Sequence, residues 1–261
     1  PYNPWVLGGP TAEALAYIAQ PLVSTGYTQQ VVRSVNVSSD LGNYGIKLPT
    51  AKNGVAVSFG AESRIEKLSL TTDTSFSTGD GAGQGAATIG RDGKIQVGEY
   101  FGEIRVPLIE GRQMADLLSV NANYRRSTYS IDKKTNTYGF GAEWAPVKAY
   151  RLRGTYNRAV RAPNINELYS AVAGNLSTIS DPCGPNPSAT LAQCQNSGIT
   201  AAQYGNPLLT SPAGQYQVLQ GGNVNLIPEK ADSHTFGLVF QPLNNLSGSV
   251  DFWSIKVADT I

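Results

Sequence analysis

The sequence predicts an all-β fold, in which about eight antiparallel strands form a segment of a larger transmembrane β-barrel with long extracellular loops. Three observations lead to this prediction. Apolar and polar residues alternate with a period of two along most of the chain. The connections between the predicted strands alternate between short and long. Many charged residues fall on the strand face opposite the apolar residues.

The alternation defines the predicted strands. In one strand, Tyr150 and Leu152 take one face, and Arg151 and Arg153 take the opposite face. The predicted strands cover residues 29–39, 54–70, 97–107, 117–130, 137–145, 149–160, 231–241 and 246–258. No run reaches the roughly 18 apolar residues that a membrane-spanning helix needs, whereas a barrel strand crosses with about ten alternating residues.

The predicted connections differ in length between the two rims of the sheet. One rim carries short turns and a somewhat longer link, at residues 108–116, 145–148, 242–245 and 40–53. The other rim carries a Gly-rich loop, a long segment, one short turn and the chain start, at residues 77–91, 161–230, 132–136 and 1–28. Short periplasmic turns and long outer loops are the layout of an outer-membrane barrel.

The charged face allows two interpretations. Its residues are Glu62, Arg64, Glu66, Glu103, Arg105, Arg125, Glu143, Arg151 and Arg153. In a barrel they line a water-filled lumen, whereas in a soluble β-sandwich, such as an adhesin or lectin, they form the solvated outer face. Aromatic residues near strand ends fit the interfacial girdles of a barrel, although aromatic residues are also common in ordinary strands. They are Tyr100, Tyr129, Tyr138, Trp144, Tyr150 and Trp253.

The number of predicted strands indicates an incomplete barrel. With the short turns in the periplasm, eight strands place both ends of the chain outside, whereas a complete barrel normally begins and ends in the periplasm. We therefore expect residues 1–261 to be part of a single barrel domain and to supply about a third of the strands of a 22-stranded barrel. A complete small barrel of eight strands is the less favoured alternative.

Composition and the two cysteines indicate which partners and which cellular compartment to expect. Lys and Arg total 20 and Asp and Glu total 19, so the net charge is +1 and no nucleic-acid partner is expected. Cys183 and Cys194 lie in one segment rich in Pro, Asn, Ser and Gly, which favours a disulfide and an oxidising compartment over two free thiols. The N-terminal PYNPWVLGG has no signal-peptide pattern, so we expect processing or truncation before residue 1.

No catalytic residue, metal site or cofactor is predicted. The only histidine, His234, falls in strand phase with Phe236, where a packed or rim residue is the simpler interpretation. The sequence has no Cys or His cluster with zinc spacing. The glycines of the Gly-rich loop are not followed by a predicted helix, as those of a phosphate-binding loop would be. No spacing selects a pair of carboxylates for glycoside hydrolysis.

Three segments carry a family resemblance. They are RGTYNRAVRAPNINELYS (153–170), GGNVNLIPEKADSHTFGLVFQP (221–242), and GEYFGEIRVPLIEG with the following LLSVNANYRRSTYS. The first resembles the strand and R-A-P-x-x-x-E-L-Y run of TonB-dependent outer-membrane receptors. The second resembles the segment that returns the chain to the next strand, and the third a strand, periplasmic turn and strand. With NPWVLGG and the helical-looking TAEALAYIAQ, the resemblance covers most of the chain.

The resemblance implies active uptake across the outer membrane of a Gram-negative bacterium. In this family a plug domain fills the barrel, the ligand binds from outside, and TonB supplies energy by contacting an N-terminal box. Neither plug nor box is found in this sequence. The implied partners are outer-membrane lipid, TonB through the absent plug, and a scarce nutrient such as a ferric siderophore, another large chelate or a glycan.

Three luminal arginines are candidates for ligand binding. Arg125, Arg151 and Arg153 offer cationic hydrogen-bond donors to an anionic or oxygen-rich ligand. Alternatively they pair with Glu143 and other carboxylates, because an unpaired charge in a confined lumen is costly. We also expect the long loops around residues 77–91 and 169–216 to supply selectivity.

The R-A-P motif supplies three further candidates, Arg161, Glu167 and Tyr169. Asn164, followed three residues later by Glu167, predicts a capped turn of helix that folds from the strand end over or into the barrel mouth. The three candidates either contact ligand directly or anchor the loop. The run from Pro228 to Lys230 is expected to start a strand.

Overall fold

The computed structural model describes residue 3 and residues 5–261. These residues form two compact units. The sheet unit comprises residues 28–68, 92–169 and 223–261, and the loop unit comprises residues 69–91, 170–222 and the described residues up to 27. Positions 1, 2 and 4 of the segment PYNPWVLGG lie outside the described residues.

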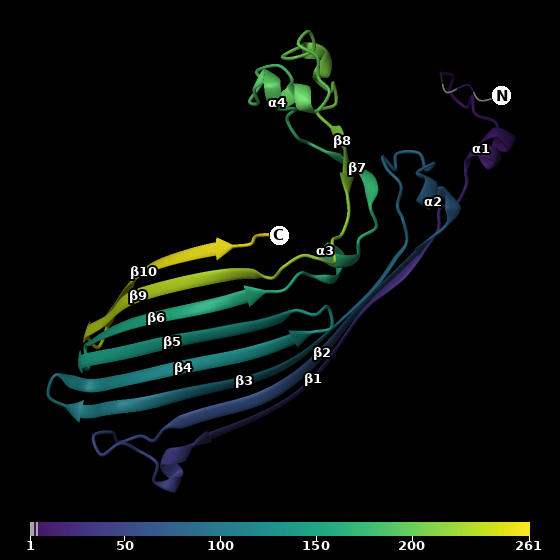
Figure 1. Cartoon of the computed structure of the whole chain (residues 1–261). Helices are drawn as coiled ribbons and strands as arrows, with labels where there is room; N and C mark the ends of the chain where they lie inside the picture. Colours follow the sequence, from purple (N-terminus) through teal and green to yellow (C-terminus); the bar gives the residue numbers. More distant parts are fainter. Residues whose placement is uncertain (1–2, 4) are drawn as a thin grey trace. The chain divides into compact units, whose positions relative to one another are not determined.

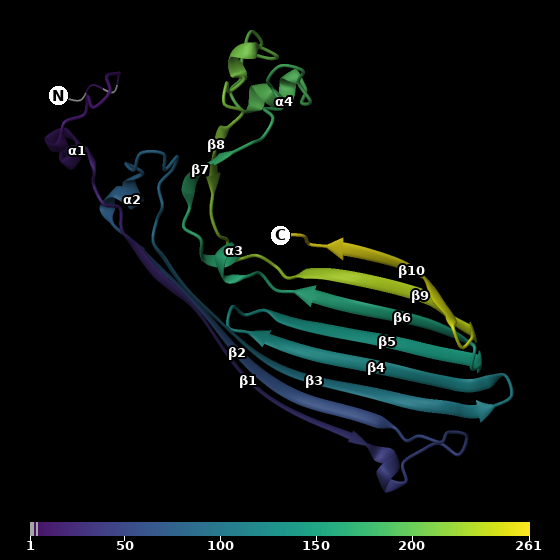
Figure 2. The ribbon, with the colours of Figure 1, turned by 180° about the vertical axis from the view of Figure 1, so that it is seen from behind.

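Eight strands form one sheet, as the sequence predicts, and their order is β1-β2-β3-β4-β5-β6-β9-β10 (Figures 1 and 2). They are β1 Ser24–Asp40, β2 Ala56–Thr72, β3 Arg91–Arg112, β4 Ala115–Tyr129, β5 Lys134–Val147, β6 Tyr150–Arg161, β9 Glu229–Leu243 and β10 Leu246–Ala258. The pairs from β3 to β10 are antiparallel. Among the described strands, β1 and β10 each have one neighbour, so the sheet is not closed.

Strand register keeps the apolar residues on one face. Trp144 lies opposite Leu152, and Leu152 lies opposite Leu238 on the next strand. Paired residues of antiparallel strands point to the same side of a sheet, so these three side chains share a face, here called the outer face. Glu143 lies opposite Arg153 on the other, luminal face.

The outer face is open within the sheet unit. Phe59, Phe140, Phe236 and Phe252 are 60%, 57%, 57% and 71% exposed. A soluble β-sandwich would bury such residues under a second sheet. In the sheet unit no second layer covers them, which contradicts the sandwich alternative.

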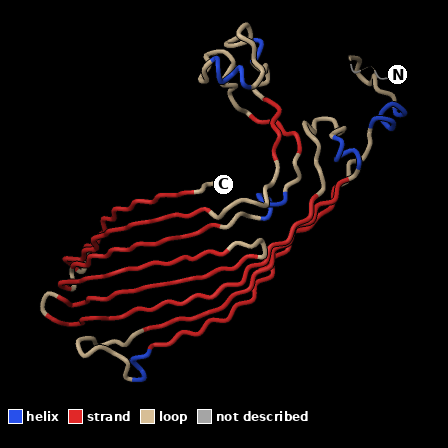
Figure 3. The backbone as a smooth tube through the Cα atoms, viewed as in Figure 1, coloured by secondary structure: helices blue, strands red, loops and turns tan. Residues whose placement is uncertain are grey.

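The turns at the rim with the short connections have fewer residues than the sequence predicts (Figure 3). The turns between β3 and β4, β5 and β6, and β9 and β10 have two residues each, at 113–114, 148–149 and 244–245. The sequence predicts a turn at 108–116, but β3 and β4 stay paired as far as Arg112 and Ala115, so the observed turn is shorter. The longer link holds a 3-10 helix, Leu41–Tyr44, which ends at Gly45 in the left-handed region (φ 80°).

The other rim carries the long connections. In the sheet unit, α3 (Ile165–Tyr169) follows β6. The loop unit contains α1 Ala12–Ile18, α2 Thr74–Thr78, β7 Ala173–Ser177, α4 Leu191–Asn196, a 3-10 helix Pro207–Leu209 and β8 Tyr216–Gln220. Strands β7 and β8 form an antiparallel pair, with residues 178–215 between them, inside the segment predicted as loop. The sequence does not indicate this pair because five-residue strands give too little alternation to recognise.

Helices play a minor part in this fold. Among the residues that the structure describes, no helix has both the length and the apolar character needed to cross a bilayer.

Candidate functional site

A cavity of about 420 Å³ on the luminal face, near the rim with the long connections, is the candidate site. Strands β2, β3, β4 and β5 supply most of its wall, and the end of β6 with the following residues supplies the rest. The lining residues are Arg64, Glu66, Ile95, Val97, Glu99, Arg125, Ser127, Tyr129, Thr135, Thr137 and residues 159–164. The wall thus presents charged groups, hydroxyls and apolar side chains, the last from Ile95, Val97, Ala159, Val160, Ala162 and Pro163.

Arg125, a predicted luminal candidate, lies in this wall and is paired. Its Nη1 donates to Glu99 Oε2 at 2.8 Å, and its guanidinium carbon lies 4.6 Å from the centre of the Phe101 ring. Ser127 Oγ donates to the other oxygen of Glu99. Since Glu99 is only 5% exposed, both bonds offset the desolvation of its carboxylate. Arg125 is therefore held against β3 while part of its side chain faces the cavity.

The R-A-P motif folds into the capped turn that the sequence predicts. Asn164 Oδ1 accepts hydrogen bonds from the amides of Asn166 and Glu167 at 2.9 and 3.0 Å. In return, Glu167 Oε2 accepts from the Asn164 amide at 2.7 Å. These reciprocal bonds form a capping box, which satisfies amides that the helix itself leaves unpaired. The box fixes the start of α3.

Arg161 joins this turn to the ends of β6 and β9. Its Nε and Nη2 donate to the two oxygens of Glu229 at 2.8 and 2.9 Å, and its Nη1 donates to both oxygens of Glu167 at 3.1 Å. Partial burial raises the pKa of Glu167, but hydrogen bonds from the Asn164 amide and Arg161 outweigh it and hold that pKa below its ordinary value. Arg161 and Glu167 anchor the turn, and Arg161 also lines the cavity.

Tyr169 places the turn over β3. A Cβ atom at Gly93 would lie 2.7 Å from Cδ2 of Tyr169, so only a glycine admits the ring at this distance. The Tyr169 hydroxyl donates to the carbonyl oxygen of Lys94 at 3.4 Å. Leu168, in the same turn, is 2% exposed, and Val97 on the luminal face of β3 is also 2% exposed. The turn therefore folds inward over β3, and its Leu168 side chain is buried in the mouth of the lumen.

Arg151 and Arg153 lie farther along β6, away from the cavity. Arg153 is eight residues from Arg161, about 27 Å along the strand. It binds both oxygens of Asp251 on β10 at 2.8 Å rather than Glu143, which contacts Arg105. Among the described residues, no carboxylate lies within ion-pair distance of Arg151.

The structure thus divides the six candidates into two groups. Arg125 and Arg161 line the cavity, with Glu167 and Tyr169 beside it, whereas Arg151 and Arg153 occupy a separate part of the luminal face. The three luminal arginine candidates, Arg125, Arg151 and Arg153, do not lie together. Arg125 is in register with Thr137, six residues beyond the partner of Arg153 on β5. Strand offset sets this spacing, and alternation alone does not reveal it.

Three acids that pair with candidate arginines, Glu99, Asp251 and Glu229, were not among the sequence candidates, whereas Glu167 was. Glu99 alternates in phase with Glu103, so the period-two pattern could have placed it on the luminal face. Asp251 alternates against Val250 and Phe252 and carries the same signal. Glu229 was assigned only to a strand start, and β9 does begin there. Which acid pairs with which arginine depends on register, which no local pattern encodes.

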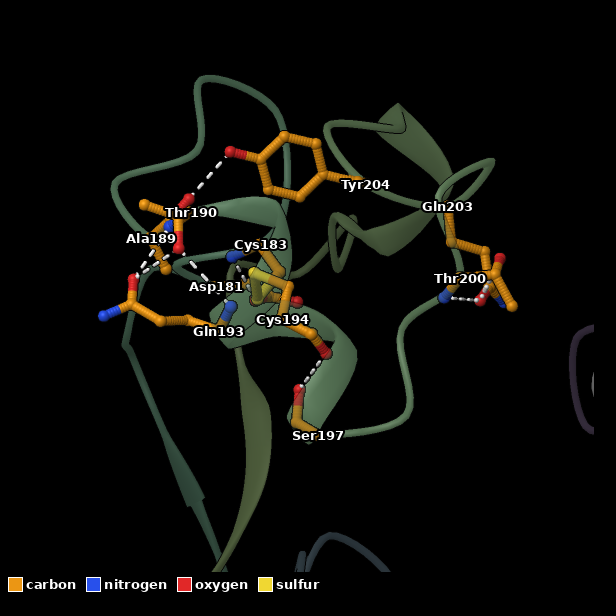
Figure 4. The surroundings of a disulfide bond; sticks show 10 residues. All are labelled: Asp181, Cys183, Ala189, Thr190, Gln193, Cys194, Ser197, Thr200, Gln203 and Tyr204. Carbon is orange, nitrogen blue, oxygen red and sulfur yellow. Dashed lines mark hydrogen bonds between the residues drawn. A yellow bond between two sulfur atoms is a disulfide. The ribbon is translucent and has the colours of Figure 1, made fainter.

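The loop unit is stabilised around a disulfide between Cys183 and Cys194, whose Cα atoms lie 5.8 Å apart (Figure 4). Both cysteines are buried. Thr190 and Gln193 form the capping box of α4, and the Tyr204 hydroxyl donates to the carbonyl oxygen of Ala189 at 2.7 Å. The disulfide and these bonds give the predicted loop a defined structure.

A second cavity, of about 450 Å³, lies within the loop unit. Hydroxyl groups are prominent in its wall, from Thr178, Ser180, Ser211 and Tyr216. The Tyr216 hydroxyl is already engaged, because it accepts from the Ser211 amide and donates to the Leu209 carbonyl, both at 3.2 Å. This cavity suits small polar groups.

Both cavities can bind a ligand through charge and hydrogen bonding. Guanidinium, carboxylate and hydroxyl groups suit an oxygen-rich ligand. Among the described residues, no group of three or more His, Cys, Asp or Glu side chains is arranged to hold a metal ion.

Comparison with known proteins identifies the family. The model of the TonB-dependent receptor-like β-barrel family matches residues 5–261. No curated protein sequence matches the chain. Among solved structures, the ferric enterobactin receptor PfeA of Pseudomonas aeruginosa, in complex with enterobactin, has a TM-score of 0.57 at 14% identity over 89% of this chain. The siderophore receptor PirA of Acinetobacter baumannii has a TM-score of 0.54 at 14% identity over 91% of this chain.

The chain spans only part of these structures, 27% of the PfeA chain and 28% of the PirA chain. At this identity the likeness shows the fold, and the family match carries the assignment. The antiparallel sheet, the luminal turn formed by the R-A-P motif and the match to nearly the whole sequence agree. The chain belongs to the family of TonB-dependent receptor β-barrels.

Proposed function

We propose that this chain is part of an outer-membrane receptor that imports a scarce nutrient with energy supplied through TonB. The observation that carries the proposal is the open outer face, where phenylalanines stay more than half exposed while charges occupy the luminal face. Such an apolar surface is stable when lipid covers it. The family consists of receptors of the Gram-negative outer membrane rather than enzymes, which supports the same location.

We infer that the eight strands belong to one larger barrel, of 22 strands, completed by further strands and filled by a plug. The unpaired edges of β1 and β10 and the partial coverage of the solved receptors support this inference. TonB would then act through the plug, and outer-membrane lipid would contact the outer face.

For the ligand we propose a ferric siderophore. The names of the structural neighbours support this class, and the arginines and hydroxyls of the luminal cavity suit an anionic, oxygen-rich chelate. Within the chain, Arg125 and the long loops would face the ligand, and Arg151 would offer a guanidinium without a carboxylate partner. Arg153, Arg161, Glu167 and Tyr169 would hold the wall in place.

The test is uptake by cells that carry the full-length receptor. Deleting its gene should abolish growth on at least one ferric siderophore of a panel under iron limitation, and an intact copy should restore it. Arg151→Gln should weaken binding of that siderophore. A full-length protein that fractionates as a freely soluble monomer would overturn the membrane assignment. A membrane-inserted receptor that imports no siderophore of the panel would overturn the ligand class alone.

A further inference from the structure

The outer face changes from aromatic to basic near the rim with the long connections. On β5, Tyr138 is followed toward this rim by Asn136 and Lys134 in the same phase, and on β6 Tyr156 is followed by Arg158. On β4, Tyr124 lies opposite Tyr138, and the next outward residue is Arg126. Strands β4, β5 and β6 adjoin in the sheet (Figure 1). Each of them places a cation beyond an outward tyrosine.

The register places these cations in one patch. Arg126 lies opposite Asn136, and Lys134 is the next residue on the same face. Arg158 lies opposite Tyr138. With strands about 4.8 Å apart and a rise of about 3.4 Å per residue, the patch is about 12–14 Å across. We call Arg126, Lys134 and Arg158 the basic patch.

Little in the protein neutralises the basic patch. Among the described residues, neither Arg126 nor Lys134 has a carboxylate within 4.0 Å. Arg158 lies 3.8 Å from Asp232, and this acid also accepts a hydrogen bond from the Tyr156 hydroxyl at 2.8 Å. The patch therefore keeps a net positive charge, and the side chains of Arg126 and Lys134 are exposed.

The position of the basic patch on the outer face indicates what kind of molecule it binds. Toward the other rim, the outer face continues with apolar residues such as Phe140, Ala142 and Leu152. Tyrosines at the end of an apolar band mark the level of lipid headgroups. Cations directly beyond them lie where lipid phosphates carry negative charge, and each such cation strengthens attachment to an anionic surface.

We propose that the basic patch binds phosphate groups of anionic lipid in the outer leaflet. Arg126 and Arg158 supply planar forks of N–H donors that match phosphate oxygens, and Lys134 adds a point charge between strands β4 and β6. The outward tyrosines below would contact the glycerol or sugar part of the same lipid. This proposal rests on the membrane placement proposed above.

The test uses the purified full-length receptor in a neutral detergent. Native mass spectrometry measures binding of diphosphoryl lipid A and of phosphatidylcholine to the unaltered protein, to R126Q/K134Q/R158Q and to the control K47Q/K52Q/K148Q. The control removes the same charge from exposed lysines of the opposite rim. We expect the triple patch variant to bind diphosphoryl lipid A about 100-fold more weakly, from the contribution of three cations near the surface. The control should bind as the unaltered protein does.

Several outcomes would overturn the proposal. One is equal binding of diphosphoryl lipid A by the unaltered protein and the patch variant, and another is equal binding of both lipids by the unaltered protein. Competition by millimolar inorganic phosphate as strong as that by lipid A would show an ion site instead of a lipid site. Heat-modifiable gel migration, measured on every variant and on each single substitution, checks barrel folding. A receptor that inserts normally but lacks the lipid preference refutes the patch without refuting the receptor function.

Discussion

Burial of Leu168 should hold the α3 turn inside the mouth of the lumen, and Leu168→Ala tests this. The side chain is 2% exposed. Truncating a buried leucine costs about 2–5 kcal/mol, made up of lost transfer free energy and the cavity left behind. Residues 163 and 164, which precede the turn, line an open cavity, and water from it can enter the space left by the truncation. We therefore expect the lower part of this range, about 2–3 kcal/mol.

The cost should appear as local opening rather than global unfolding, because the strands pair independently of the turn. Hydrogen exchange of the amides of residues 164–169 in the full-length receptor is the assay. A loss of about 2–3 kcal/mol corresponds to about 30- to 150-fold faster exchange. Asn166→Ala is the matched control, since that side chain is exposed in the same turn and should change stability by less than about 0.5 kcal/mol. Equal exchange in the two variants would refute the anchoring role of Leu168.

Three further predictions concern Glu167, the disulfide and the outer face. The pKa of Glu167 is held below its ordinary value of 4.5, so the stability that its carboxylate gives the turn is complete above pH 4.5 and is lost as the pH falls through the lower pKa of the folded state. Hydrogen exchange of the turn amides, relative to unfolded peptide, should rise in that pH range. Glu167→Gln should remove this pH dependence. Replacing Cys183 and Cys194 by serine should destabilise the loop unit by about 2–3 kcal/mol, since the bridge closes a loop of 11 residues. Proteolysis between residues 180 and 205 should therefore become faster. An unchanged rate of cleavage would contradict the stabilising role of the disulfide. Phe236→Lys should lower the free energy of unfolding of the barrel by about 2–4 kcal/mol, measured by urea titration in lipid vesicles. The control Thr235→Lys, on the luminal face, should lower it much less. Equal losses would argue against lipid contact at Phe236.

Local patterns predicted the sheet well. Alternation placed all eight strands of the main sheet and the two faces, because in a barrel each strand has one face toward lipid and one toward water. The capping box at Asn164 and Glu167 was predictable for the same reason, since both bonds form within four residues. Strand ends were less accurate, and β3 begins six residues before and ends five residues after its predicted range.

The candidate site was predicted only in part. Sequence phase placed Arg125 and Arg153 on the luminal face, but their partners Glu99 and Asp251 depend on strand register and on long-range pairing. Burial of Glu99 was not predictable either, because Arg125 and Ser127 contact its carboxylate only once β3 and β4 have paired. The antiparallel pair of β7 and β8 was not predicted, because both strands are short and lie in a segment rich in Gly, Pro and Ser.

The central claim is that one face of the sheet contacts lipid and the other contacts enclosed water. Nitroxide labels at four consecutive positions of β9, residues 236–239, test it directly in the full-length receptor in lipid vesicles. We expect labels at 236 and 238 to collide more often with oxygen, which concentrates in the bilayer, and labels at 237 and 239 to collide more often with a water-soluble nickel chelate. Equal accessibility at all four positions, or the opposite alternation, would contradict the assignment.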